Sequence, residues 1–285
     1  MNRADFRIAL IVTTYNRPDA LAAVLDGCLA QTDGNFEVII ADDGSTQDTA
    51  QLIAAYQARA PFPLRHIWQE DIGFRAAAIR NRALAATQAD YIIFTDGDCV
   101  PPPDFVASHR QLAEHGCFLS GNRLLLSQAF TGQVLRERVP IHQWGVRDWL
   151  RARRLGHIER LLPLLPLPLG RLRKLWPRRW QGAKTCNLSA WRVDLLRVNG
   201  LDESYTGWGL EDSDLVVRLL RAGIYNKSAR FAVPVFHLWH RENDRSQLEE
   251  NRRRLQEVLQ ATHIRARQGV DQYLPTAAAT GGERA

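Results

Sequence analysis

The chain has 285 residues, of which 45% are hydrophobic and 24% charged. These values suit a globular protein with a sizeable core, and they exclude a collagen, a coiled coil and a chain that is disordered throughout. The net charge is +6, but residues 147–179 hold ten basic and two acidic residues, or +8, so the rest of the chain sums to 6 − 8 = −2 and no nucleic acid is expected as a partner.

The N-terminal region predicts a strand and a cytoplasmic protein. Its apolar run, Ile8 to Val12, is too short for a signal-peptide core or a membrane span. The four cysteines contain no CxxC pair, so neither a zinc ribbon nor a disulfide scaffold is indicated. Four reduced thiols in the cytoplasm are expected.

Apolar runs alternate with helical patterns along the first 115 residues. Expected strands cover residues 7–14, 37–41, 64–68 and 91–95, and expected helices cover 16–31, 45–58, 75–87 and 103–114. Ser45 and Asp48 resemble a capping box at the second helix. Strands separated by helices of this length imply an α/β fold with a buried, mostly parallel, Rossmann-like sheet flanked by helices.

The second half of the chain is less regular. It contains a turn at 206–209, an expected helix at 211–222, an expected strand at 231–238 and a long charged helix at 246–267, followed by a tail from Thr276 that is expected to be disordered. The basic segment interleaves leucines, prolines and arginines in RLLPLLPLPLGRLRKLW. Such a surface suits an anionic membrane face or an anionic acceptor, and a solvated insertion remains the alternative.

Two carboxylate clusters follow expected strands directly. Ligands of parallel sheets bind beyond the carboxyl ends of the strands. Asp42 and Asp43 could accept hydrogen bonds from a nucleobase or ribose, although helix capping is the preferred explanation when this motif is taken alone. Asp96 and Asp98, in Asp-Gly-Asp, form a partial oxygen site for Mg²⁺ or Mn²⁺ that water and a diphosphate would complete.

The third cluster is GWGLEDSD, at residues 207–214. A tryptophan between glycines offers a mobile aromatic platform for a sugar. Glu211 and Asp212 follow at a helix N-terminus, where the macrodipole favours ionised carboxylates and therefore lowers their basicity. A weak base can still accept the proton of an acceptor hydroxyl if that proton is transferred late in the reaction, after charge has developed on the acceptor. A capped surface helix is the alternative.

Taken in order, the motifs VTTYNRP, ADDGS, AIRN, DGD and GWGLEDSD resemble those of family 2 glycosyltransferases with the GT-A fold. The segment from GAKTCNLSAWR onward resembles the C-terminal part of β-1,4-galactosyltransferases and of bacterial chondroitin polymerases. The resemblance covers about residues 7–245 without the basic segment. It implies a nucleotide-sugar-binding half at 1–125, a basic insertion at 126–180, an acceptor-binding and catalytic half at 181–245, a helix at 246–275 and a tail at 276–285.

The resemblance also implies roles for individual residues. Nucleotide-binding positions match Thr13, Tyr15, Asp42, Asp43, Arg80, Asn81 and Asp96. Asp98 matches the aspartate that binds the metal directly, Asp212 the general base, and Glu211 and Trp208 acceptor-binding positions.

A histidine ligand is expected after the last core strand, where the sequence offers His237 and His240, with His237 preferred. Two features depart from the pattern. Leu210 stands where the galactosyltransferase turn usually has a glycine, and the basic segment has no counterpart, so acceptor specificity is one role for it.

The expected activity is that of an inverting, metal-dependent glycosyltransferase. It would use Mn²⁺ or Mg²⁺ and move a sugar from a nucleotide-sugar, by resemblance a UDP-sugar, to a hydroxyl of a cell-surface glycan or glycolipid such as lipopolysaccharide or capsule. Contact with the inner face of the cytoplasmic membrane stays open. The alternatives are a sugar nucleotidyltransferase, although the N-terminal loop lacks its glycines and lysine, and a non-catalytic glycan-binding module.

Overall fold

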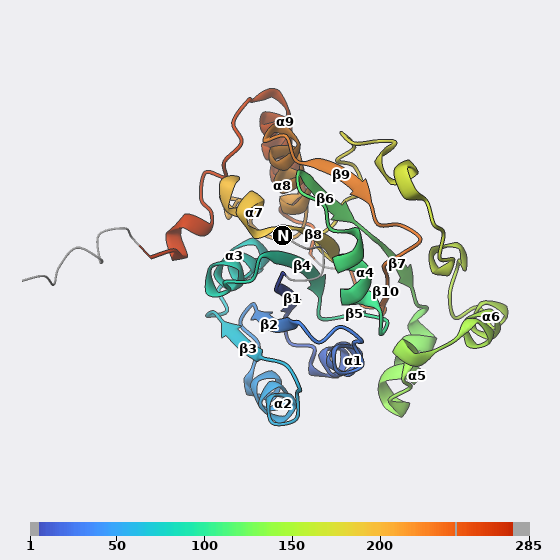
Figure 1. Cartoon of the computed structure of the whole chain (residues 1–285). Helices are drawn as coiled ribbons and strands as arrows, with labels where there is room; N and C mark the ends of the chain where they lie inside the picture. The colour runs from blue at the N-terminus through green and yellow to red at the C-terminus, as the bar shows by residue number, and fades with distance from the viewer. Residues whose placement is uncertain (1–5, 243, 276–285) are drawn as a thin grey trace, which may run out of the picture.

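Two β-sheets and their flanking helices make up the computed structural model, which describes residues 6–242 and 244–275 (Figure 1). The larger sheet has seven strands in the order β3-β2-β1-β4-β8-β6-β9. Their bounds are Ile8–Thr14 (β1), Phe36–Asp42 (β2), Leu64–Trp68 (β3), Tyr91–Asp96 (β4), Cys117–Ser120 (β6), Asn187–Trp191 (β8) and Tyr225–Ser228 (β9). All neighbours are parallel except those of β8, so the expected mostly parallel α/β sheet is confirmed.

A smaller sheet of three strands lies beside the large one, in the order β5-β10-β7. Its strands are Cys99–Val100 (β5), Asn122–Leu125 (β7) and Pro234–His237 (β10). In the register of this sheet His237 is opposite Cys99 on one side and Leu125 on the other. The central strand therefore carries one predicted metal ligand to a position beside the Asp-Gly-Asp turn.

The helices cover both faces of the large sheet. They are Pro18–Leu29 (α1), Gln47–Gln57 (α2), Ala76–Ala86 (α3), Phe105–Leu112 (α4), Gln128–Glu137 (α5), Val146–Arg154 (α6), Arg192–Arg197 (α7), Glu211–Arg221 (α8) and Leu248–Gln260 (α9), with short 3-10 turns at Ile141–Gln143 (η1), Leu162–Leu164 (η2), Gly170–Lys174 (η3) and Val270–Tyr273 (η4). Side chains alternate along a strand. Ile8, Leu10 and Val12 therefore pack with α1, α2 and α4, whereas Ala9 and Ile11 pack with α3, α7 and α8.

Strand register fixes where the polar strand ends lie. Thr14 is opposite Asp42 and Thr13 is opposite Asp96, in the pairs that β1 makes with its two neighbours. Since these strands are parallel, their carboxyl ends lie at one edge of the sheet. Three motifs that are far apart in the sequence are brought together there.

Several predicted boundaries were wrong. The capping box is absent, because the Ser45 hydroxyl accepts from the backbone N–H of Asn16 and the first turn of α2 has no side-chain cap. The strand predicted at 231–238 covers only Pro234–His237. The last helix ends at Gln260 because the following backbone bonds elsewhere, with the Ala266 N–H donating to Val198 O.

The strand order mixes the two halves of the chain, since β8 pairs with β4 and β9 pairs with β6. The five-part division remains a prediction, and the tail at 276–285 lies outside the described residues. In the part of the chain that the structure describes, every helix is too short or too polar for a membrane span.

Candidate active site

The predicted nucleoside residues gather at the ends of β1 and β2. Tyr15 is 48% exposed, and its hydroxyl donates to Asp71 (2.8 Å). Asp43 is buried, and it accepts from the Gln69 amide (2.5 Å) and the Arg75 backbone N–H (2.8 Å). Burial raises the pKa of Asp43. The exposed Tyr15 ring is suited to stacking on a nucleobase, and a nearby carboxylate is suited to accepting hydrogen bonds from the polar edge of that base.

Asp42 is fully engaged inside the protein. One carboxylate oxygen accepts from the Ser45 N–H (2.8 Å), and the other lies 2.9 Å from His66 Nε2. Only 1% of the residue is exposed. Asp42 therefore shapes the loop after β2, and Asp43, whose two oxygens also accept from the protein, shapes the loop that leads to α3.

Arg80 links the two halves of the site. Its buried guanidinium donates to Thr13 Oγ1 (3.0 Å), Asp96 Oδ1 (2.9 Å) and Glu211 Oε1 (3.2 Å). The two carboxylates raise the pKa of Arg80 against the opposing effect of burial. One cation thus connects the end of β1, the Asp-Gly-Asp turn and the N-terminus of α8.

The side chain of Asn81 makes its hydrogen bonds to other parts of the protein. Its amide donates to Leu201 O and Glu203 Oε1, each at 2.8 Å, and accepts from the Leu201 N–H (2.9 Å). The side chain is completely buried. Asn81 therefore holds the loop before α8, and its predicted contact with the nucleotide has no support in this geometry.

Glu211 and Asp212 begin α8 with unusual electrostatics. Burial raises the pKa of Glu211 to about 7, with the Asp212 charge acting in the same direction and Arg80 against it. The pKa of Asp212 is also raised by burial, against Lys184 and Arg80. The helix dipole lowers the pKa of such groups, but the loss of solvent outweighs it here. Both carboxylates are more basic than their position on a helix suggests.

The turn before α8 is held from α9. Leu210 has a left-handed backbone (φ 78°), which explains why glycine suits this position. The Asn251 amide donates to Thr206 O (3.1 Å) and Gly209 O (3.0 Å). The Trp208 ring lies under the Arg245 guanidinium, 5.2 Å from its centroid. The predicted acceptor loop is therefore braced by the last helix.

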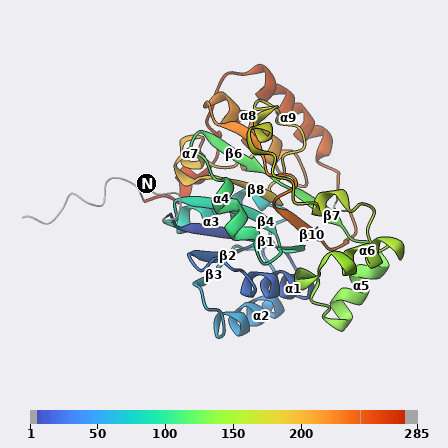
Figure 2. The same ribbon diagram turned by 45° about the vertical axis from the view of Figure 1, so that its right-hand side comes forward.

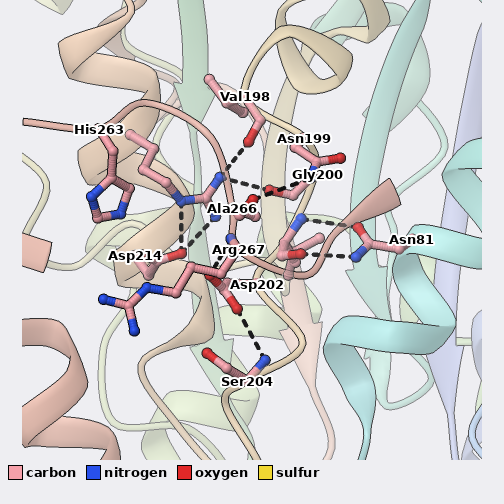
Figure 3. Close-up of polar contacts among 12 residues, drawn as sticks. Asn81, Val198, Asn199, Gly200, Asp202, Ser204, Asp214, His263, Ala266 and Arg267 are labelled. Carbon is pink, nitrogen blue, oxygen red and sulfur yellow. Dashed lines mark hydrogen bonds and ion pairs between the residues drawn. The ribbon is translucent and has the colours of Figure 1, made fainter. Parts of the chain in front are cut away.

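A buried ion pair on α8 attaches this helix to the loop at residues 198–200 (Figure 3). Arg218 donates to Asp214 Oδ2 through Nε (2.8 Å) and Nη2 (2.5 Å), and both side chains are completely buried. The same guanidinium donates to Val198 O (2.6 Å) and Gly200 O (2.9 Å). The loop that Asn81 binds is thereby tied to the helix that carries Glu211 and Asp212.

The candidate metal site combines Asp98 with two histidines. His240 Nε2 lies 3.3 Å and His237 Nε2 3.8 Å from the same oxygen, Asp98 Oδ2. Burial raises the pKa of Asp98 and lowers that of His237. The Cys99 thiol donates to the other Asp98 oxygen (3.5 Å). A carboxylate with two imidazoles beside it is a donor set that Mn²⁺ accepts.

Most of the predicted site residues lie close together, because the strand register aligns the ends of β1, β2 and β4 and Arg80 binds residues of β1, β4 and α8. Sequence reasoning missed Asp71, Gln69 and Lys184, because a single polar residue in a loop carries no pattern. It also missed the role of Arg80 as a bridge, since Glu211 is 131 residues away in the chain.

These features define an α/β protein with a cluster of polar side chains at the carboxyl edge of its sheet. The model of glycosyl transferase family 2 matches residues 9–160, and that of the N-terminal domain of galactosyltransferase matches residues 173–241. The chain belongs to glycosyl transferase family 2. The nucleotidyltransferase and the non-catalytic module are therefore set aside.

Curated relatives agree with this assignment. Validoxylamine A glucosyltransferase of Streptomyces hygroscopicus subsp. jinggangensis is 30% identical over 232 residues, which is 76% of this chain and 52% of the relative. Chondroitin synthase of Escherichia coli is 26% identical over 250 residues, 79% of this chain and 34% of the relative. The chain thus spans about half or less of the length of these relatives.

Solved structures share the fold. A mannosyltransferase from Pyrobaculum calidifontis, in complex with GDP-mannose and Mn²⁺, matches with a TM-score of 0.57 at 18% identity, covering 83% of this chain and 58% of that one. TarS of S. aureus, residues 1–349, matches with a TM-score of 0.54 at 15% identity, covering 94% and 68%. The GT-A fold expected from the motifs is confirmed.

Proposed function

We propose that this glycosyltransferase inverts the anomeric centre, depends on Mn²⁺ or Mg²⁺, and moves a sugar from a UDP-sugar to a hydroxyl of a cell-surface glycan or glycolipid. The observation that carries the proposal is the junction at Arg80, which joins the Asp-Gly-Asp turn to the carboxylates of α8. The proposed donor and acceptor sites would thereby meet at one edge of the sheet.

The donor site is assigned to the ends of β1, β2 and β4. Tyr15 would stack on the base, Asp43 would read its polar edge, and Asp96 would lie near the ribose. The exposed Tyr15 ring and the burial of Asp43 support these roles. The mannosyltransferase relative binds a nucleotide-sugar, which is consistent with a nucleotide-sugar donor here.

The metal would be held by Asp98 with His237, His240 or both. The donor set fits, because the Nε2 atoms of both histidines lie within 4 Å of the same Asp98 oxygen. When bound, the metal neutralises charge on the diphosphate leaving group. His237 sits on a paired strand, whereas His240 Nδ1 bonds to Arg241 O (2.7 Å), which orients its Nε2. The preference for His237 remains a prediction.

Asp212 is the proposed general base. It would take the proton from the acceptor hydroxyl as that oxygen forms a bond to the anomeric carbon. The bond from this carbon to the diphosphate oxygen breaks on the opposite face, so an α-linked donor gives a β-glycoside. The raised pKa of Asp212 favours this role. Glu211 and Trp208 would orient the acceptor.

The decisive test is a donor-hydrolysis and transfer panel of UDP-sugars with Mn²⁺, using the wild-type enzyme and Asp98→Ala. We expect Asp98→Ala to abolish transfer and metal-dependent UDP binding, and EDTA to do the same to the wild type. Wild-type activity in EDTA would refute the metal dependence. In a Mn²⁺ titration, His237→Ala is expected to raise the metal requirement more than His240→Ala, and the reverse ranking would overturn that preference.

A further inference from the structure

Residues 146–179 are firmly attached to the fold. The buried Arg173 donates to Ser228 O (3.0 Å), Arg230 O (2.8 Å) and Leu167 O (3.0 Å). Lys174 forms an ion pair with Glu114. Figures 1 and 2 show this segment running along one side of the molecule, outside β7 and β9. Two of its ten cations therefore hold the segment in place and are not available to a partner.

The other eight cations have no side-chain partner among the residues that the structure describes. Among residues 6–242 and 244–275, none of their guanidiniums has a carboxylate within 4 Å or makes a side-chain hydrogen bond, and all are exposed. They are Arg147, Arg151, Arg153, Arg154, Arg160, Arg171, Arg178 and Arg179. A fixed surface with this many unpaired positive charges attracts an anionic partner.

Large apolar side chains are exposed between these arginines. Eighteen large hydrophobic residues are exposed in the described part of the chain, and nine of them fall within residues 146–176. Leu172, Leu175 and Trp176 are 57%, 58% and 65% exposed. Beside them lies a hollow of about 570 Å³ lined by Leu175, Trp176, Pro177, Arg178, Arg179 and Gln181. Exposed apolar area of this density marks an interaction surface.

We propose that the exposed side chains of residues 146–179, here called the docking surface, bind the enzyme to a bilayer that contains anionic lipids. Arginine with leucine and tryptophan is the combination that lies at a lipid interface, with the charges at the phosphates and the apolar groups below them. A soluble anionic acceptor would account for the arginines but would leave the leucines in water.

One part of the segment that carries the docking surface contacts the small sheet that holds His237. Ile158 bridges to Leu126 directly after β7, and η2 packs on β7. Strand β7 pairs with β10, where Leu125 is opposite His237. A lipid-linked acceptor held at the bilayer would therefore meet the catalytic edge from the side of this small sheet. Docking itself rests on the surface alone and not on the proposed donor, metal or base.

The test is sedimentation of the full chain with vesicles of phosphatidylcholine, with and without phosphatidylglycerol, at low and high salt. We expect binding only to the anionic vesicles. Replacing Arg171, Arg178 and Arg179 by Gln should weaken it by roughly fivefold per charge, about a hundredfold in total, and flatten the salt dependence. Replacing Leu172, Leu175 and Trp176 by Ser should weaken binding at every salt concentration.

Matched variants control for charge and for exposed apolar area. Replacing Arg59, Arg252 and Arg265 by Gln removes the same charge elsewhere on the surface. Val193→Ser removes an exposed apolar side chain outside the docking surface and is compared with the single variant Leu175→Ser, since Val193 and Leu175 are 67% and 58% exposed. Both controls should bind like the wild type, and circular dichroism with UDP-sugar hydrolysis in the absence of vesicles reports folding. Equal sedimentation with both lipids, or equal loss in test and control variants, would overturn docking and leave the proposed activity intact.

Discussion

The two carboxylates at the start of α8 illustrate a competition between the helix dipole and burial. The dipole stabilises the ionised forms of Glu211 and Asp212 and so lowers their pKa. Burial and their mutual repulsion act the other way and prevail, bringing the pKa of Glu211 to about 7. Two adjacent carboxylates can thus be poised for proton transfer near neutral pH.

Asp212→Asn should reduce kcat by about two to four orders of magnitude, the usual worth of a positioned base. UDP-sugar affinity should stay near normal, because the proposed donor contacts lie on β1, β2 and β4. Glu211→Gln should act mainly on the acceptor KM. The measurement is kcat and UDP-sugar affinity for both variants, with circular dichroism as the folding control. If folded Asp212→Asn has a normal kcat, Asp212 is not the general base and Glu211 becomes the candidate. If this variant loses UDP-sugar binding, Asp212 belongs to the donor site.

The pKa of Glu211 also predicts how stability depends on pH. Its folded value of about 7 exceeds the ordinary 4.5, so between these values the native state binds more protons than the unfolded state. This group's contribution to stability is therefore lost as pH rises through that window, by at most about 1.4 kcal/mol per pH unit. Between pH 4.5 and 7, the free energy of unfolding of Glu211→Gln should therefore rise relative to that of the wild type. Above pH 7 the difference should stay constant.

Urea unfolding at a series of pH values measures that difference. Glu70→Gln is the control, since the Glu70 side chain is exposed. A constant difference between Glu211→Gln and the wild type across the window would contradict the assigned cause.

At the scale of elements, α8 is oriented by contacts on its buried face. Arg218 pairs with Asp214 on the same helix and donates to the carbonyls of the 198–200 loop (Figure 3). Asn81 on α3 accepts from the backbone N–H of the next residue, Leu201. The helix that presents Glu211 is therefore held against α3, from which Arg80 reaches back to Glu211. The geometry of the proposed catalytic residues thus depends on side chains that need not touch any ligand.

Arg218→Ala should lower the free energy of unfolding by about 3–5 kcal/mol, because it leaves Asp214 charged, buried and unpaired. Arg218→Lys keeps the charge but loses the fork of hydrogen bonds, so an intermediate loss is expected. Arg252→Ala, which removes an exposed ion pair on α9, should cost less than about 1 kcal/mol. Urea unfolding ranks the three, and a loss from Arg218→Ala no larger than that from Arg252→Ala would contradict the role of the buried pair.

At the scale of the whole molecule, a nucleotide with its metal would bridge strands of both sheets. Saturation with UDP and Mn²⁺ at a hundred times the dissociation constant should add about 2.7 kcal/mol, or about 5 °C in Tm. Thermal unfolding should show this shift in the wild type and in Asp212→Asn but not in Asp98→Ala. A shift retained by Asp98→Ala would place the metal elsewhere.

Local pattern was sufficient for the first half of the fold. The strand at 64–68 was predicted to the residue, and β1, β2 and β4 to within one residue at each end, because buried parallel strands are short apolar runs bounded by polar turns. The capping box and the length of α9 were wrong. In both cases a backbone or hydroxyl group found a partner distant in sequence, Asn16 for Ser45 and Val198 for Ala266.

The sequence by itself determined the family, the order of the motifs and the carboxyl-edge position of Asp42, Asp43, Asp96 and Asp98, since these depend on short runs of residues. Only the tertiary structure decided which of these groups meet. The bridge from Arg80 to Glu211 and the burial that raises the pKa of Glu211 arise from contacts across more than a hundred residues. Likewise, composition marked residues 147–179 as basic, but folding decided that Arg173 and Lys174 anchor the segment while eight arginines face outward.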